Sequence, residues 1–149
     1  MQYTGSGTCV SVSAASPATH DSTGFAALTY TQVGELATLG AVQSTFEMAT
    51  FDSLCTGVRT KVPGIREVAD FEITYALDRD DAGYALLAGA HEDKDIVSLR
   101  IVDPQGTLYM TARVMSHKYA EGSDPNAIVI GSNTFSPVPG AGGVITVIV

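Results

Sequence analysis

The sequence contains no tryptophan, only two cysteines and no long apolar run. Cys9 and Cys55 are too few for a disulfide framework or a four-ligand zinc site, and neither belongs to a CxxC pair. We therefore expect two free thiols. No stretch of about 18 apolar residues is present, and the apolar segment 144–149 is too short to span a bilayer, so we expect no membrane partner.

Charged residues are also scarce. Asp, Glu, Lys and Arg make up 16% of the 149 residues, whereas about 25% is typical of soluble domains. Sixteen acidic residues against eight basic ones give a net charge of −8, which opposes tight binding to a phosphate backbone. The hydrophobic fraction of 45% excludes a disordered chain, and we expect part of the apolar surface to meet a partner.

The length fits one domain, because domains cluster at about 100–150 residues. We predict a single domain over 1–149 with three peripheral parts. These are an extended N-terminal arm at 1–19, a long loop at 43–66 and a C-terminal tail at 137–149. The first seven residues do not combine a basic region with an apolar one, so we expect no signal peptide.

A two-residue alternation dominates the sequence and predicts a mainly β protein. In the clearest strand, 70–77, Phe71, Ile73 and Tyr75 alternate with polar residues, so these two sets lie on opposite faces. Asp103-Pro104-Gln105-Gly106 fits a type I turn between two further strands. The other predicted strands cover 25–31, 35–42, 96–102, 107–119, 127–135 and 144–149.

One helix of about three turns is predicted after the strand at 70–77. Asp80 and Asp81 can cap its N-terminus, where carboxylates are favourable, and it would end near Ala90 or His91. The residues spaced as one buried face are Gly83, Leu86, Leu87 and Ala90. The predicted class is therefore all-β with one helix.

The segment 46–66 carries apolar residues without a sustained period, and its glycines and Pro63 mark turns. This favours a projecting loop or hairpin whose apolar side chains meet a partner, the alternative being a surface loop that closes over its own core. Arg59, Lys61 and Arg66 lie in the same segment, but no series of aromatic residues lies between them. This favours basic residues at the edge of a contact with an acidic protein surface over a nucleic-acid binding site.

The motifs that suggest chemistry are each incomplete. The segment 78–83 opens like an EF-hand loop, but Gly89 stands where the bidentate glutamate is needed. His91-Glu92 begins a zinc-protease motif, but Asp95 replaces the second histidine. The glycines at 140–143 precede no helix pattern, so we interpret them as a linker. We therefore predict no catalytic residue, no cofactor and no metal site.

Several segments, taken in order, resemble the tail tube (major tail) proteins of long-tailed bacteriophages of the siphophage type. The resemblance extends from about Phe25 to Phe135 and implies an antiparallel β-sandwich or half-barrel with one flanking helix, and no enzyme activity. The matching segments are 24–30 with 33–35, 51–58 with 61–64, 80–87, 103–106 and 113–118.

The resemblance also implies an assembly. In that family six copies close into a ring whose pooled strands form a barrel around a lumen, and the rings stack into a tube that conducts DNA. The implied location is the virion tail, assembled in the host cytoplasm. The implied partners are further copies of the chain, a tape-measure protein, a tail terminator and a distal tail protein, with DNA only as non-specific passing cargo.

Two sets of site residues follow from the resemblance. The long loop would stack one ring on the next, and its expected contact residues are Phe46, Phe51, Leu54, Val58, Arg59, Lys61 and Arg66. An acidic lumen would repel phosphates and let DNA slide. Asp70, Glu72 and Thr74, on the polar side of the strand at 70–77, are the candidates for lining that lumen.

Two alternatives remain open. A tube protein of a contractile injection or type VI secretion system resembles the same fold. A ligand-binding β-sandwich of an adhesin would explain the Ser- and Thr-rich strands, but it leaves the absence of tryptophan and of a signal peptide unexplained. The tail at 137–149 departs from the family pattern and could add either a strand or a contact between subunits.

Overall fold

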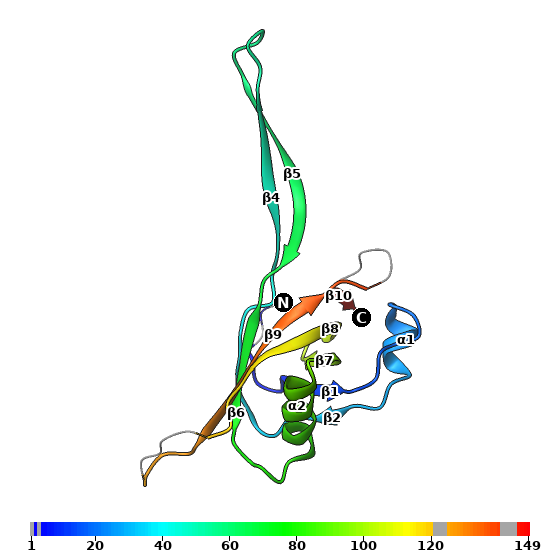
Figure 1. Ribbon diagram of the computed structural model, residues 1–149, viewed down its shortest axis with the longest axis vertical. Coiled ribbons are helices and arrows are strands. Elements are labelled where there is room, and N and C mark those ends of the chain that lie inside the picture. Colours follow the sequence, from blue (N-terminus) through cyan, green and yellow to red (C-terminus); the bar gives the residue numbers. More distant parts are fainter. Residues whose placement is uncertain (1, 3, 121–124, 141–145) are drawn as a thin grey trace.

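The computed structural model describes residues 2, 4–120, 125–140 and 146–149. A compact body carries one long projecting hairpin (Figure 1). Within the described ranges, no helix is long and apolar enough to cross a membrane. The elements are β1 (Cys9–Ser13), α1 (Ser22–Ala26), β2 (Thr31–Gln32), β3 (Leu36–Leu39), β4 (Ser44–Asp52), β5 (Arg59–Val68), β6 (Phe71–Ala76), α2 (Ala82–Asp93), β7 (Ile96–Asp103), β8 (Gly106–His117), β9 (Ile130–Val138) and β10 (Thr146–Ile148).

The body is built on one antiparallel sheet of eight strands in the order β2-β1-β7-β8-β9-β6-β3, with β10 beside β8. The long β8 strand pairs with β10 at Leu108 to Met110 and with β9 from Thr111 onward. Helix α2 covers one face, where it packs on β8, β1 and β2 (Figure 1). The mainly antiparallel architecture with one main helix agrees with the sequence prediction.

The main core lies between α2 and the sheet. Alternation places every second residue of each strand on this side, as Val97, Leu99 and Ile101 of β7 illustrate. Each fully buried side chain of this kind contributes about 1.5–3 kcal/mol. The strand β6 follows the predicted alternation, because Phe71, Ile73 and Tyr75 are buried while Glu72 is exposed. The other large members of the core are Val10, Val12, Leu87, Met110, Val114 and Phe135.

The helix α2 agrees with its prediction in length and in most of its buried face. Asp81, and not Asp80, is its N-cap, and the carboxylate accepts hydrogen bonds at 3.1 Å from the backbone N–H groups of Tyr84 and Gly34. The same carboxylate therefore caps the helix and fixes the chain before β3. Tyr84 is buried in place of the expected Leu86, which is only half-buried.

The predicted strand at 25–31 is wrong, because the segment begins as helix at 25–26 and continues as a turn and irregular chain through 30. Asp21 caps the short helix α1 by accepting from the N–H of Gly24 at 2.7 Å. Phe25 then packs on the sheet face opposite α2, stacked on Tyr109 at a ring-centroid distance of 5.4 Å. Only the last residue of that segment, Thr31, lies in a strand, the two-residue β2.

The expectation of a peripheral arm at 1–19 is wrong for β1, which pairs with both β2 and β7 inside the sheet. Val10 and Val12 are fully buried, and their small size fits beneath α2.

The last long strand is Ile130–Val138, three residues later than predicted. Of the predicted terminal strand, Thr146–Ile148 forms β10, and 144–145 lie outside the described residues.

Candidate assembly surface

The segment predicted as a projecting loop or hairpin is a hairpin of β4 and β5. Its pairing runs from Ser44 opposite Val68 at the base to Asp52 opposite Arg59 at the tip. All nine residues of β4 and the first nine of β5 are exposed. At about 3.3 Å per residue, nine residues project the hairpin roughly 30 Å from the body (Figure 1).

The hairpin exposes large apolar side chains that a folded monomer does not bury. Their exposed fractions run from 51% at Val62 to 102% at Leu54, which stands on the tip. A two-stranded hairpin alone in water is marginally stable at best. Burial of its apolar area against a partner would stabilise it by about 25 cal/mol per Å², and this free energy is not gained while the area is exposed. These two costs point to a partner surface. The exposed set is Phe46, Met48, Phe51, Leu54, Val58, Val62 and Ile65.

The tip is closed by polar contacts. The Arg59 guanidinium donates from Nε to Asp52 Oδ1 at 2.6 Å and from Nη2 to Oδ2 at 3.2 Å. The bonds of Ser53 N to Val58 O and of Gly57 N to Ser53 O close the turn, in which Gly57 has a positive φ of 66°. Arg59 therefore has its ion-pair partner, Asp52, within the hairpin. The other two basic residues of the hairpin, Lys61 and Arg66, form no ion pair with a described residue.

The residues proposed for the lumen lie as the alternation predicted. Asp70 and Glu72 are exposed and Thr74 is half-buried, on the side of β6 opposite its core residues. The Thr74 hydroxyl contacts the Thr38 hydroxyl of the neighbouring strand β3. Which of these residues face a lumen stays a prediction.

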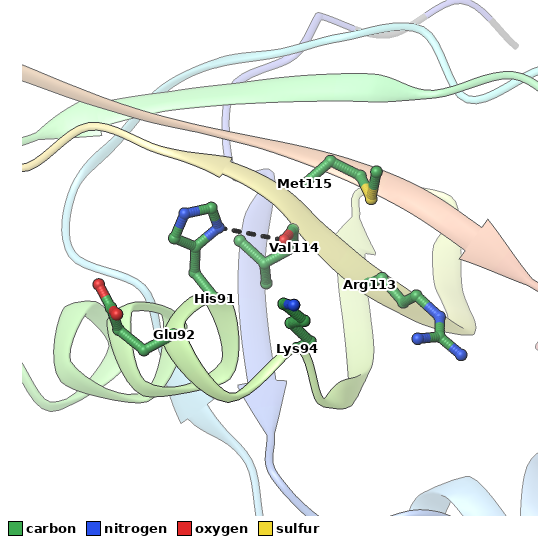
Figure 2. A pocket seen from close by; sticks show the side chains of 6 residues that line it. All are labelled: His91, Glu92, Lys94, Arg113, Val114 and Met115. Atoms are coloured by element: carbon green, nitrogen blue, oxygen red, sulfur yellow. Dashed lines mark hydrogen bonds between the residues drawn. The ribbon is translucent and has the colours of Figure 1, made fainter.

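A groove of about 530 Å³ lies where the C-terminal end of α2 meets β8 (Figure 2). His91 Nδ1 donates to the carbonyl oxygen of Val114 at 3.3 Å and ties the helix to the strand. Lys94, the C-cap of α2, has φ 59°, a left-handed conformation that favours glycine. Met115 is the extra residue of a β-bulge in β8, and its side chain is exposed. Sequence reasoning missed this groove, because its two sides are about twenty residues apart and neither carries a motif.

His117 belongs to a cluster of rings beside this groove. Its ring contacts those of Tyr84 and Tyr119 at centroid distances of 4.8 and 4.7 Å. The Tyr119 hydroxyl donates to a carboxylate oxygen of Glu92. Among the residues that the structure describes, no three His, Cys, Asp or Glu side chains are grouped to hold a metal ion. Cys9 and Cys55 are free thiols, as expected.

No known protein family profile matches the chain, and no curated protein sequence matches it. Solved structures do. The SPP1 tail tube superposes with a TM-score of 0.64 and 19% identity, over 87% of this chain and 72% of that one. The tail of an empty gene transfer agent particle superposes with a TM-score of 0.67 and 12% identity, over 93% of this chain and 96% of that one.

A component of a contractile system is similar to a comparable degree. The tube-terminating cap of the anti-feeding prophage has a TM-score of 0.61 and 12% identity, and the match covers 100% of this chain and 93% of the cap. At these identities the similarity is one of fold. The chain therefore has the tail tube fold, as its sequence predicted.

Proposed function

We propose that this chain is the major structural subunit of a phage tail tube of the siphophage type. In this proposal six copies form a ring, and rings stack around a lumen through which the genome passes into the host. The carrying observation is the projecting hairpin, with its exposed apolar side chains, on a body with the tail tube fold. The gene transfer agent tail, refined with C6 symmetry, supports six copies for each ring.

The hairpin would supply the contact between stacked rings. Its apolar side chains need a surface, and six hairpins on one rigid ring add their contributions, so individually weak contacts give stable stacking. Lys61 and Arg66 would meet carboxylates of the adjoining subunit and set register and orientation more than affinity.

The remaining partners in this proposal are a tape-measure protein, a terminator and a distal tail protein, and DNA is a passing cargo. The subunit acts in the virion tail and performs no catalysis.

A second candidate is a tube or cap component of a contractile injection system, because the anti-feeding prophage cap matches the whole chain. A cap ends a tube, whereas a tube subunit extends it. Electron microscopy of the purified protein, alone and with a tape-measure partner, separates these functions. We expect long tubes of stacked rings, and isolated rings that never elongate would favour the cap.

The hairpin's role is tested by replacing residues 47–65 with Asn-Gly. Phe46 and Arg66 are a cross-strand pair, and a two-residue Asn-Gly turn joins such a pair. We expect the variant to keep the circular dichroism spectrum of a folded β protein and its melting temperature, because nearly all of the removed residues are exposed, and to form no tubes in negative-stain images.

The matched variant replaces only 53–58 with Asn-Gly, between the paired Asp52 and Arg59. It keeps both strands and loses the apolar tip residues Leu54 and Val58, so we expect fewer and shorter tubes. Normal tubes from the variant that lacks 47–65 would show that the hairpin does not stack rings. A wild-type protein that never forms rings or tubes would contradict the proposed function itself.

A further inference from the structure

The hairpin has two chemically different faces, which follow from its register. Cross-strand partners share a face and alternate residues change face. One side, the basic face, consists of Ser44, Phe46, Met48, Thr50, Asp52, Arg59, Lys61, Pro63, Arg66 and, buried at the base, Val68. The other, the acidic face, consists of Thr45, Glu47, Ala49, Phe51, Thr60, Val62, Ile65 and Glu67. The basic face carries three cationic side chains and one carboxylate. The acidic face carries two carboxylates and no cationic side chain.

A β-bulge creates this segregation. Between the pairs Phe46–Arg66 and Met48–Pro63, β4 has one residue, Glu47, while β5 has two. Lys61 and Arg66 are five residues apart, so strict alternation along β5 would place them on opposite faces. The extra residue of the bulge brings them to the same face. Gly64 permits the bulge, because a Cβ there would lie 2.8 Å from the carbonyl oxygen of Glu47.

The charge outside the hairpin is strongly of one sign. The hairpin, 44–68, holds three of the eight basic and three of the sixteen acidic residues and is neutral, so the body holds five against thirteen and carries all of the net −8. Nine described carboxylates of the body are exposed on several separate parts of it, so its surface is acidic in several directions. They are Asp21, Glu35, Asp70, Glu72, Asp78, Asp80, Glu92, Asp93 and Asp95.

We infer that the hairpin docks on a second copy of this chain by its basic face, which lies against the acidic body of that copy. The inference rests on the proposed function and adds which face makes the contact. Phe46 and Met48, 59% and 61% exposed, supply the apolar part of the contact. Lys61 and Arg66 supply its charges, because neither forms an ion pair with a described residue, although Arg66 Nε donates to Ser44 Oγ at 2.7 Å. The acidic face would be repelled by the same surface, so the two sides of the hairpin are not interchangeable.

The test compares two matched neutralisations with the wild type. The basic-face variant is Lys61→Gln with Arg66→Gln, and the acidic-face variant is Glu47→Gln with Glu67→Gln. Tube growth is followed by light scattering at about 0.05 M and about 0.5 M salt, between which screening of exposed charges becomes strong. Melting temperatures confirm that both variants fold.

The basic-face variant should grow at least about tenfold more slowly at low salt and lose most of the salt dependence seen in the wild type. The acidic-face variant should grow at the wild-type rate or faster. Equal slowing of both variants, or slowing of the acidic-face variant alone, would overturn the inference while leaving the tube function intact. Wild-type protein that forms no tubes at all would contradict both proposals.

Discussion

His117 belongs to a chain of hydrogen bonds that leads into the core. The Tyr75 hydroxyl donates to Asn133 Oδ1, and Asn133 Nδ2 donates to His117 Nδ1 at 2.7 Å. Since Nδ1 accepts, the proton of the neutral ring is on Nε2, which is buried without a hydrogen-bond partner among the described residues. Burial, followed by the neighbouring His91, lowers the pKa of His117 below its usual 6.5. Burial also raises the pKa of the Tyr75 hydroxyl to about 12, so this donor keeps its proton.

This arrangement predicts a pH-dependent stability. Because the pKa of His117 is lower in the folded chain, the unfolded chain binds a proton first as the pH falls below 6.5. The free energy of unfolding of the unassembled protein should therefore decrease between about pH 7.5 and about pH 5.5. Urea titrations at these two pH values measure it.

The control is His117→Gln, which keeps a polar side chain but cannot titrate. We expect its stability to change less with pH than that of the wild type. The titratable groups that face His117 are Tyr84, His91, Glu92 and Tyr119, and all of them are retained in the variant. An identical pH dependence in both proteins would assign the effect to one of these neighbours.

At the scale of elements, two glycines of α2 have opposite roles. Gly83 is buried, and a Cβ there would lie 2.6 Å from the carbonyl oxygen of Gln32 and 2.9 Å from Val33 Cα. It therefore allows the helix to approach the chain at β2 closely. Gly89 is exposed and a Cβ there would meet nothing within 4 Å.

Alanine at these two positions should change stability in opposite directions. Gly89→Ala should raise the free energy of unfolding by about 0.5–1 kcal/mol, because alanine is the better helix former. Gly83→Ala should lower it by about 1–3 kcal/mol, because backbone must move to admit the methyl group. Chemical denaturation of both variants measures the difference. Equal effects would mean that α2 does not pack closely on β2.

The same elements show how far the sequence predicts the fold. Strand β6, helix α2 and the turn at 103–106 were predictable, because period, capping residue and turn residues agree locally. Helix α1 was not, since Phe25-Ala26-Ala27-Leu28 suits either a strand or a helix and the choice depends on Asp21 and on Tyr109, which is distant in sequence. The groove and the two hairpin faces depend on bulges, which no residue pattern identified.

At the scale of the whole molecule, the charge has a consistent distribution. The hairpin that would join copies is neutral, and the body carries the negative charge. In a tube, a body surface that faces the lumen would present carboxylates to the passing phosphates. Repulsion at such a wall prevents DNA from binding during passage, and at physiological salt it extends over about 8 Å.

We predict that Asp70 and Glu72 form part of that wall, because they extend from the exposed side of β6 while the opposite side is buried in the core. A three-dimensional reconstruction of the assembled tube locates both side chains directly. Tubes of Asp70→Lys with Glu72→Lys should retain double-stranded DNA at low salt, whereas tubes of Asp93→Lys with Asp95→Lys, which reverse two exposed carboxylates at the end of α2, should not. A reconstruction that places Asp70 and Glu72 on the outer wall, or equal DNA retention by the two variants, would show that another face of the sheet lines the lumen.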